Sequence, residues 1–176
     1  MFENVQKISI IGGPGTGKTT LSNNIGKELN YPIYHIDGIH HLENWVKRDS
    51  EERDRIILEK VNEPKWVIDG TYRSTLEQRV KNSDLIIFLD YSSFDKLKGI
   101  LSRYFKNRGI ERPEIPGCKE QMNLTFMKFT LEWNRTKGKF VKDVLKNNKD
   151  KEIIVFKNRR NLNKWYQTQF GKKIEV

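Results

Sequence analysis

The sequence has little cysteine, no long apolar run and no internal repeat. A single cysteine, Cys118, excludes an intramolecular disulfide and gives no framework for a metal. No apolar run approaches the ~18 residues of a membrane-spanning helix, and the first residues lack the basic stretch followed by an apolar one that marks a secretion signal. We therefore expect a cytoplasmic protein without a membrane partner.

The chain is rich in positive charge. It holds 33 Lys and Arg against 23 Asp and Glu, for a formal net charge of +10. Between Lys96 and Lys149, 14 basic residues stand against 5 acidic ones, so +9 of net charge lies in that stretch. Such a region either binds an anion or forms a solvated face. The candidate anions are a nucleoside triphosphate, a second phosphorylated substrate and nucleic acid.

The 176 residues fit one domain, and short apolar runs alternate along them with amphipathic stretches. The apolar runs predict strands at residues 5–11, 32–36, 65–68, 85–89 and 153–156. The amphipathic stretches predict helices at residues 19–29, 49–61, 92–107, 123–146 and 161–170. Strands that alternate with helices predict a doubly wound α/β fold with a five-stranded parallel sheet. Ligands of such sheets bind beyond the carboxyl ends of the strands.

One motif identifies a chemistry. Residues 12–19 are Gly-Gly-Pro-Gly-Thr-Gly-Lys-Thr, the pattern G-x-x-x-x-G-K-T between an expected strand and an expected helix. Glycines let successive N–H groups point inward at an anion, and the helix N-terminus adds positive potential. The sequence therefore predicts a P-loop for ATP and Mg²⁺, with Lys18 on the β- and γ-phosphates and Thr19 on the metal. The expected binding residues are Gly12, Gly13, Pro14, Gly15, Thr16, Gly17, Lys18, Thr19 and Thr20.

Acidic residues follow three of the expected strands. Asp37, Asp69 and Asp90 stand where apolar runs end, and a P-loop enzyme needs a carboxylate near its metal or its acceptor. The residue types leave open which of the three serves magnesium. Gly70, directly after Asp69, allows the backbone to approach a substrate closely.

A long aperiodic segment interrupts the alternation. Residues 107–122 contain Gly109, Pro113, Pro116 and Gly117, and a loop of this length in a compact domain is usually functional or disordered. We interpret residues 103–137, which include the flanking helix ends, as a lid. Residues 38–61 form the expected acceptor-binding segment.

Several motifs in order resemble a known family. They are residues 34–37 (Tyr-His-Ile-Asp), 66–72 (Trp-Val-Ile-Asp-Gly-Thr-Tyr), 75–79 (Thr-Leu-Glu-Gln-Arg), 86–90 (Ile-Ile-Phe-Leu-Asp), and Arg108 and Arg112-Pro with Gly117-Cys118. Together they look like the bacterial DNA topology modulation protein (FlaR-related) family, within the adenylate-kinase-like branch of P-loop proteins, over nearly the whole chain. The resemblance implies a five-stranded kinase core, ATP binding and kinase chemistry. Thr71-Tyr72-Arg73 departs from the Phe-Pro-Arg of adenylate kinases, which places AMP as acceptor in doubt.

Partly on this resemblance, Asp69 is the expected magnesium ligand beside Thr19, and Asp37 the residue on the side of the acceptor hydroxyl. Arginine supplies fixed cations where charge develops on a transferring phosphoryl group. Arg79, after the Asp-Gly pair, is expected to face the acceptor pocket, and the lid arginines are expected to close over the phosphates. The arginines expected in the site are Arg79, Arg103, Arg108 and Arg112, with Arg160, next to Arg159, near the nucleotide base.

Two hypotheses follow. In the first, the protein is a kinase that transfers the γ-phosphate of ATP to a small nucleotide-like or hydroxyl acceptor. In the second, less favoured, it is an ATP-binding protein associated with nucleic acid, although no DNA-reading module is recognisable. The direction of the basic side chains separates them, since a kinase turns its arginines into the cleft.

Overall fold

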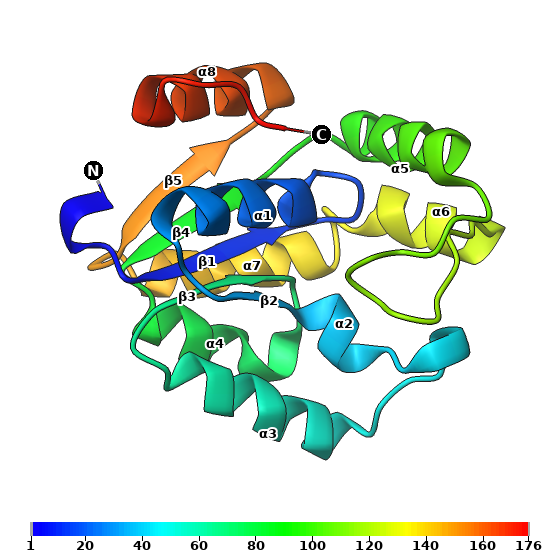
Figure 1. The fold of residues 1–176 in the computed structure, drawn as a ribbon, viewed down its shortest axis with the longest axis horizontal. Helices are drawn as coiled ribbons and strands as arrows, with labels where there is room; N and C mark the ends of the chain where they lie inside the picture. Colours follow the sequence, from blue (N-terminus) through cyan, green and yellow to red (C-terminus); the bar gives the residue numbers. More distant parts are fainter. Residues whose placement is uncertain (1, 176) are drawn as a thin grey trace.

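The computed structural model describes residues 2–175 and places five strands in one sheet (Figure 1). The sheet order is β2-β3-β1-β4-β5, and every neighbouring pair is parallel. This confirms the predicted doubly wound sheet of five parallel strands. The strands are β1 (Lys7–Gly12), β2 (Ile33–His35), β3 (Trp66–Asp69), β4 (Leu85–Leu89) and β5 (Glu152–Phe156).

Helices cover both faces of the sheet (Figure 1). Side chains alternate along each strand, so that Ile87 of β4 joins the apolar core under α1 and α8, while Phe88 joins the core under α4 and α7. A third cluster packs Ile57 of α3 against Trp66 of β3. The helices are α1 (Lys18–Leu29), α2 (Ile36–His40), α3 (Ser50–Val61), α4 (Arg73–Asn82), α5 (Ser93–Asn107), α6 (Leu124–Glu132), α7 (Lys137–Asn147) and α8 (Arg159–Phe170), with short 3-10 turns η1 (Phe2–Asn4) and η2 (Glu43–Trp45).

The predicted helix over residues 123–146 is wrong as a single element. The chain leaves α6 at Trp133 and begins α7 at Lys137, with Thr136 in a non-helical conformation between them. The turn lets the Trp133 ring enter the core, where only 1% of its surface is exposed. Gly138 makes room for this ring, because a β-carbon there would lie 2.8 Å from it. Tertiary packing thus overrides the helical pattern of the sequence.

The lid segment between α5 and α6 lies against the region that follows β2 (Figure 1). The backbone N–H of Trp45 donates to the sulfur of Cys118 at 3.2 Å, and the indole N–H of Trp45 donates to the carbonyl of Lys119 at 3.1 Å. A β-carbon on Gly38 would lie 2.2 Å from the carbonyl oxygen of Glu114. The lid segment is therefore closed over α2 and η2, at the edge where β1 and β3 end.

Among residues 2–175 no helix is both long enough and apolar enough to cross a bilayer.

Candidate phosphotransfer site

The P-loop connects the end of β1 to the start of α1. Gly15 and Gly17 have φ of 72° and 89°, a left-handed conformation that glycine adopts without strain. The Thr16 hydroxyl donates to the Gly13 carbonyl at 2.9 Å and fixes the curl of the loop. Helix α1 begins without a side-chain cap, so its first N–H groups are free to bind an anion. The predicted binding residues from Gly12 to Thr20 lie together in this turn.

Lys18 turns back onto its own loop. Its ammonium donates to the Gly13 carbonyl at 3.0 Å. Burial lowers the pKa of Lys18, and the charges of Asp37 and Asp69 oppose that effect while Arg103 and Arg112 add to it. These four residues come from three segments far apart in the sequence. The charges of the strand ends and of the lid therefore both act on the P-loop lysine.

Asp69 lies at the end of β3 with 2% of its surface exposed. Its Oδ2 accepts a short hydrogen bond from the Ser22 hydroxyl of α1 and lies 2.6 Å from Nδ1 of His35. Burial lowers the pKa of His35, but the hydrogen bond and charge of Asp69, with the charges of Glu114 and Asp37, raise it overall. Ser22 lies in no motif of the sequence, and His35 lies in the motif at residues 34–37, from which only Asp37 was predicted as a site residue.

Asp37 lies in the first turn of α2, two residues beyond β2. The Tyr72 hydroxyl donates to its Oδ1 at 3.3 Å. Burial raises the pKa of Asp37, yet the charges of Lys18, Arg112 and His41 and the Tyr72 hydrogen bond hold the pKa below its usual value. Asp37 is therefore an ionised carboxylate beside the P-loop lysine.

Asp90 has a different environment. Its Oδ2 forms an ion pair with Lys142 at 3.1 Å and another with Lys157. Lys142 belongs to α7, and Lys157 directly follows β5. Among the three acids at strand ends, Asp37 and Asp69 have the largest effects on the pKa of Lys18.

Two lid arginines face inward. Arg103 of α5 and Arg112 of the lid loop bracket the buried carboxylate of Glu120, at 3.0 Å and 3.8 Å. Arg112 also pairs with Glu114 at 2.5 Å. Their charges lower the pKa of Lys18, and their predicted contact with the phosphates stays a prediction.

The structure places Arg108 and Arg79 differently from their predicted positions. Helix α5 ends at Asn107, and Arg108 turns outward, exposed, with its guanidinium 5.9 Å from the Tyr104 ring centre. Arg79 does not face the acceptor pocket, because its side chain is fully buried and donates to the carbonyls of Gly70 at 3.1 Å and Tyr72 at 3.5 Å. Arg79 thereby supports the turn that follows Asp69.

Lys96 is a buried residue that sequence reasoning missed. Its ammonium lies 4.5 Å from the Trp133 ring centre and hydrogen-bonds Asn134. Burial lowers the pKa of Lys96 to about 8. The charge of Asp90 opposes this effect, and the charges of Lys142 and Lys18 add to it. A β-carbon on Gly13 would lie 2.6 Å from the Lys96 side chain, so this lysine packs directly on the P-loop.

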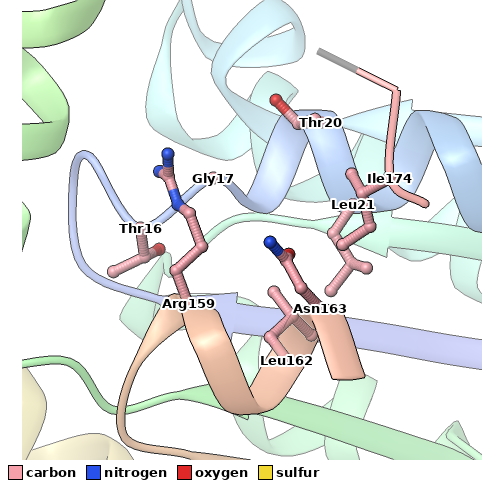
Figure 2. Close-up of a pocket in the computed structure, with 8 residues that line it drawn as sticks. All are labelled: Thr16, Gly17, Thr20, Leu21, Arg159, Leu162, Asn163 and Ile174. Carbon is pink, nitrogen blue, oxygen red and sulfur yellow. The ribbon is translucent and has the colours of Figure 1, made fainter. Parts of the chain in front are cut away.

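A pocket beside the P-loop lies between α1 and α8 (Figure 2). Arg159 extends from the start of α8 toward Gly17 and forms one wall (Figure 2). Of the two arginines predicted near the nucleotide base, Arg159 lines the pocket, whereas Arg160 is exposed and does not line it. The lining residues are Thr16, Gly17, Thr20, Leu21, Arg159, Leu162, Asn163 and Ile174.

The C-terminal tail closes one side of this pocket through Ile174 (Figure 2). Asn24 of α1 holds the tail by two hydrogen bonds to Glu175. Its Nδ2 donates to the Glu175 carbonyl at 2.9 Å, and its Oδ1 accepts from the Glu175 N–H at 2.8 Å. A second hollow, lined by Tyr91 and Ser102 among others, lies on the other side of Arg159.

Comparisons with known proteins concern the fold and the region around the P-loop. A model of the AAA family, the ATPase family associated with various cellular activities, matches residues 8–91, from β1 to just beyond β4. A search of curated proteins returns no match.

Solved structures of kinases share the fold. Shikimate kinase from Acinetobacter baumannii, in complex with shikimate, is 15% identical over 99% of this chain and 98% of that one, with a TM-score of 0.59. Shikimate kinase from Bacteroides thetaiotaomicron is 18% identical over 96% and 99%, with a TM-score of 0.58. Deoxyadenosine kinase from M. mycoides, with bound dATP, is 17% identical over 95% and 100%, with a TM-score of 0.53.

At these identities the likeness shows the fold alone. The fold is that of a P-loop NTPase, in the five-stranded arrangement found in small kinases. The likeness to DNA topology modulation proteins stays a prediction.

Proposed function

We propose that this protein is an ATP- and magnesium-dependent phosphotransferase that moves the γ-phosphoryl group of ATP to a hydroxyl of a small acceptor. One observation carries the proposal: the ionised Asp37 and the lid arginine Arg112 share an electrostatic environment with Lys18 of the P-loop. A phosphate-binding lysine, a carboxylate that can accept a proton and a cation from a closed lid are the parts that phosphoryl transfer needs.

The residues divide the work as follows. The P-loop N–H groups and Lys18 hold the β- and γ-phosphates, and the pocket next to Arg159 takes the base. Asp37 accepts the proton of the acceptor hydroxyl as its oxygen attacks the γ-phosphorus. The bond from that phosphorus to the β–γ bridging oxygen breaks, ADP leaves with the bond's electron pair, and the proton passes from Asp37 to solvent. Arg103 and Arg112 stabilise the negative charge on the phosphoryl oxygens.

The residues present fit a magnesium ion. The Thr19 hydroxyl and the Asp69 carboxylate are the hard oxygen donors that Mg²⁺ prefers. Asp69 uses Oδ2 for its contacts with Ser22 and His35, and Oδ1 accepts no hydrogen bond from residues 2–175. Thr19 and Asp69 would therefore hold the metal, directly or through water, and the metal would neutralise charge on the β- and γ-phosphates.

The nucleic-acid hypothesis receives less support. In the basic stretch, Arg103 and Arg112 turn inward onto Glu120 and do not form an outward stripe. Two of the structures that share the fold, shikimate kinase and deoxyadenosine kinase, are named for a small-molecule and a nucleoside substrate. Both observations favour the kinase.

The direct test is a screen for transfer of radiolabelled γ-phosphate from ATP to nucleosides, nucleoside monophosphates, sugars, sugar acids and shikimate. We expect at least one acceptor to be labelled by the wild type, and none by a folded Lys18→Ala variant. Lys139→Ala, which changes an exposed lysine on α7, is the matched control and should retain transfer. Intact ATP binding without transfer to any acceptor, together with salt-sensitive DNA binding, would favour the nucleic-acid hypothesis.

A further inference from the structure

The turn that leads into α4 connects Asp37 to an arginine of α3. The Tyr72 hydroxyl donates to Asp37, and the guanidinium of Arg53 lies 5.1 Å from the centre of the Tyr72 ring. Arg53 comes from α3, and its Nη2 donates to the Ser74 hydroxyl at 3.1 Å. His40 completes the group, with its ring 5.0 Å from that of Tyr72 and its Nδ1 3.5 Å from Arg53 Nη1. Arg53 therefore lies one aromatic ring away from the Asp37 carboxylate.

Two more cations reach the same turn. Arg73, between Tyr72 and Ser74, lies 4.3 Å from the centre of the Phe140 ring of α7. Lys137, the first residue of α7, lies one helical turn before Phe140. Burial lowers the pKa of Lys137, and the charges of Arg73, Arg53 and Lys47 lower it further. The charge of Asp37 raises this pKa in part. The cations of α3, α4 and α7 thus gather around the turn that holds Tyr72, the residue that donates to Asp37.

This positive charge is only partly neutralised within the chain. Arg53 pairs with Asp54 at 2.7 Å. No carboxylate of residues 2–175 lies within 4.0 Å of the charged nitrogens of Arg73 or Lys137. Asp37 itself is already shared with Lys18 and Arg112. The cation cluster of Arg53, Arg73 and Lys137 is therefore an electrostatic surplus next to the proposed base.

The helix starts make the surplus more pronounced. Helices α4 and α7 open with Arg73 and Lys137, and neither has a side-chain cap. A cation at a helix N-terminus opposes the helix dipole and is unfavourable. In the first turn of α4, the buried Thr75 hydroxyl also has no hydrogen-bond partner within residues 2–175. A bound anion would compensate the charge that the fold itself leaves uncompensated.

We infer that the acceptor is an anion: a small hydroxyl compound that carries a carboxylate or a phosphate, with its hydroxyl at Asp37 and its anionic group at Arg53, Arg73 and Lys137. The inference rests on the proposed function, because it assigns a substrate class to the same site. A carboxylate and a phosphate are recognised by the same cation chemistry, so the test includes both.

The experiment compares a neutral hydroxyl compound with an anionic counterpart. The pairs are deoxyadenosine with its 5′-monophosphate, and glucose with gluconate. Binding is measured by calorimetry in the presence of Mg²⁺ and a non-hydrolysable ATP analogue, which fills the P-loop so that the anion cannot bind there. Transfer from ATP is measured separately. The variants are Arg73→Gln and Lys137→Gln, with Lys137→Arg as a rescue and the exposed Lys139→Gln as the matched control.

In at least one pair the wild type should prefer the anionic member. Lys137→Gln and Arg73→Gln should each raise the Kd and KM of that member by roughly tenfold to a hundredfold, as expected for loss of a charged hydrogen bond. The KM for ATP should stay unchanged in both variants. Lys139→Gln should match the wild type, and Lys137→Arg should restore most of the affinity. If Lys137→Gln does not fold, Arg73→Gln carries the test.

The two proposals fail separately. If the anionic members bind and Lys137→Gln abolishes binding, but no compound accepts phosphate, the anion site stands and the phosphotransferase proposal is rejected. If neutral acceptors are phosphorylated as well as charged ones, and neither Arg73→Gln nor Lys137→Gln changes the Kd or KM of an acceptor, the inference of an anionic acceptor is rejected. If the variants lose only the binding of duplex DNA, the cation cluster belongs to a nucleic-acid site and the inference is overturned.

Discussion

Gly99 of α5 lies directly against the P-loop at Gly15. A β-carbon on Gly99 would be 2.0 Å from the Gly15 carbonyl oxygen, and a β-carbon on Gly15 would be 2.2 Å from the carbonyl oxygen of Lys96. Backbone therefore touches backbone between the phosphate loop and the helix that leads into the lid. One helical turn beyond Gly99 lies Arg103, one of the two lid arginines that turn inward. The helix that carries a lid arginine therefore packs on the P-loop backbone without a side chain between them.

The first prediction follows from this contact. Gly99→Ala should weaken ATP binding and lower the melting temperature, because an added methyl must displace the P-loop or the helix. Overpacking of this kind costs about 1–3 kcal/mol. ATP titration and thermal unfolding measure the two effects. Ser102→Ala, at an exposed position of α5, is the control and should change neither. Unaltered affinity and stability in Gly99→Ala would show that the contact is loose.

The parts of the site that are local in sequence could be predicted. The P-loop was recognisable because its anion site is built from consecutive residues, and its glycines take the left-handed conformations that the motif requires at Gly15 and Gly17. The strand ends were recognisable from apolar runs that stop at an acid. Asp37 and Asp69 were therefore expected near the P-loop, and both act on Lys18.

The parts that depend on tertiary packing could not be predicted. Lys96 looks like any basic residue of an amphipathic helix, and only the packing of α5 against Trp133 buries it. Arg159 and Arg160 are equivalent in the sequence, and the rotation of α8 decides which one lines the pocket. Arginine is usually exposed, and the sequence does not show that the packing of α4 against the sheet buries Arg79.

The second prediction separates the acids at the strand ends. Asp37→Asn should lower kcat by roughly 10²–10⁴-fold, the usual contribution of a general base, and leave ATP affinity little changed. Asp90→Asn should retain turnover and lose at most about 1 kcal/mol of stability, since its lysine partners are largely exposed. Steady-state kinetics and denaturant unfolding measure both. The reverse pattern would place the catalytic carboxylate on β4.

The third prediction concerns the metal. Asp69→Asn should raise the Mg²⁺ concentration needed for half-maximal turnover, because it removes the charge of the proposed ligand while keeping its shape. ATP binding without metal should change much less. A titration of turnover with Mg²⁺ at saturating ATP tests the idea. Ser22→Ala is a useful comparison, because it removes a hydrogen bond to Asp69 and keeps the carboxylate. An unchanged metal requirement in Asp69→Asn would exclude Asp69 as the ligand.

The fourth prediction is a dependence of stability on pH. Asp69 and Glu114 raise the pKa of His35 above its unfolded value near 6.5, despite the opposing effect of burial. Protonated His35 therefore stabilises the fold below pH 6.5, and this contribution is lost as pH rises through the folded pKa. The free energy of unfolding of the wild type should exceed that of His35→Gln most at pH 6, and the difference should shrink toward pH 9. Lys96 titrates in both proteins, so its effect cancels in the difference. A constant difference would contradict the assignment.

The fifth prediction compares two lid arginines that the sequence alone does not distinguish. Arg112 faces inward, where its charge acts on Lys18 and Asp37, whereas Arg108 is exposed beside Tyr104. Arg112→Ala should lower kcat by about 10²–10³-fold, the cost of removing one donor that stabilises transition-state charge, while the Kd for ATP changes little. Arg108→Ala should keep most of the turnover. Arg112→Ala also removes the ion-pair partner of Glu114 and one of the two partners of Glu120, which keeps Arg103. Arg112→Lys keeps the charge, and it should recover only part of the rate since it lacks the planar fork of arginine. Equal losses in Arg108→Ala and Arg112→Ala would mean that the lid moves far enough during turnover to bring both arginines to the phosphates. Hydrogen exchange over residues 108–122, with and without ATP and acceptor, would then show stronger protection in the complex.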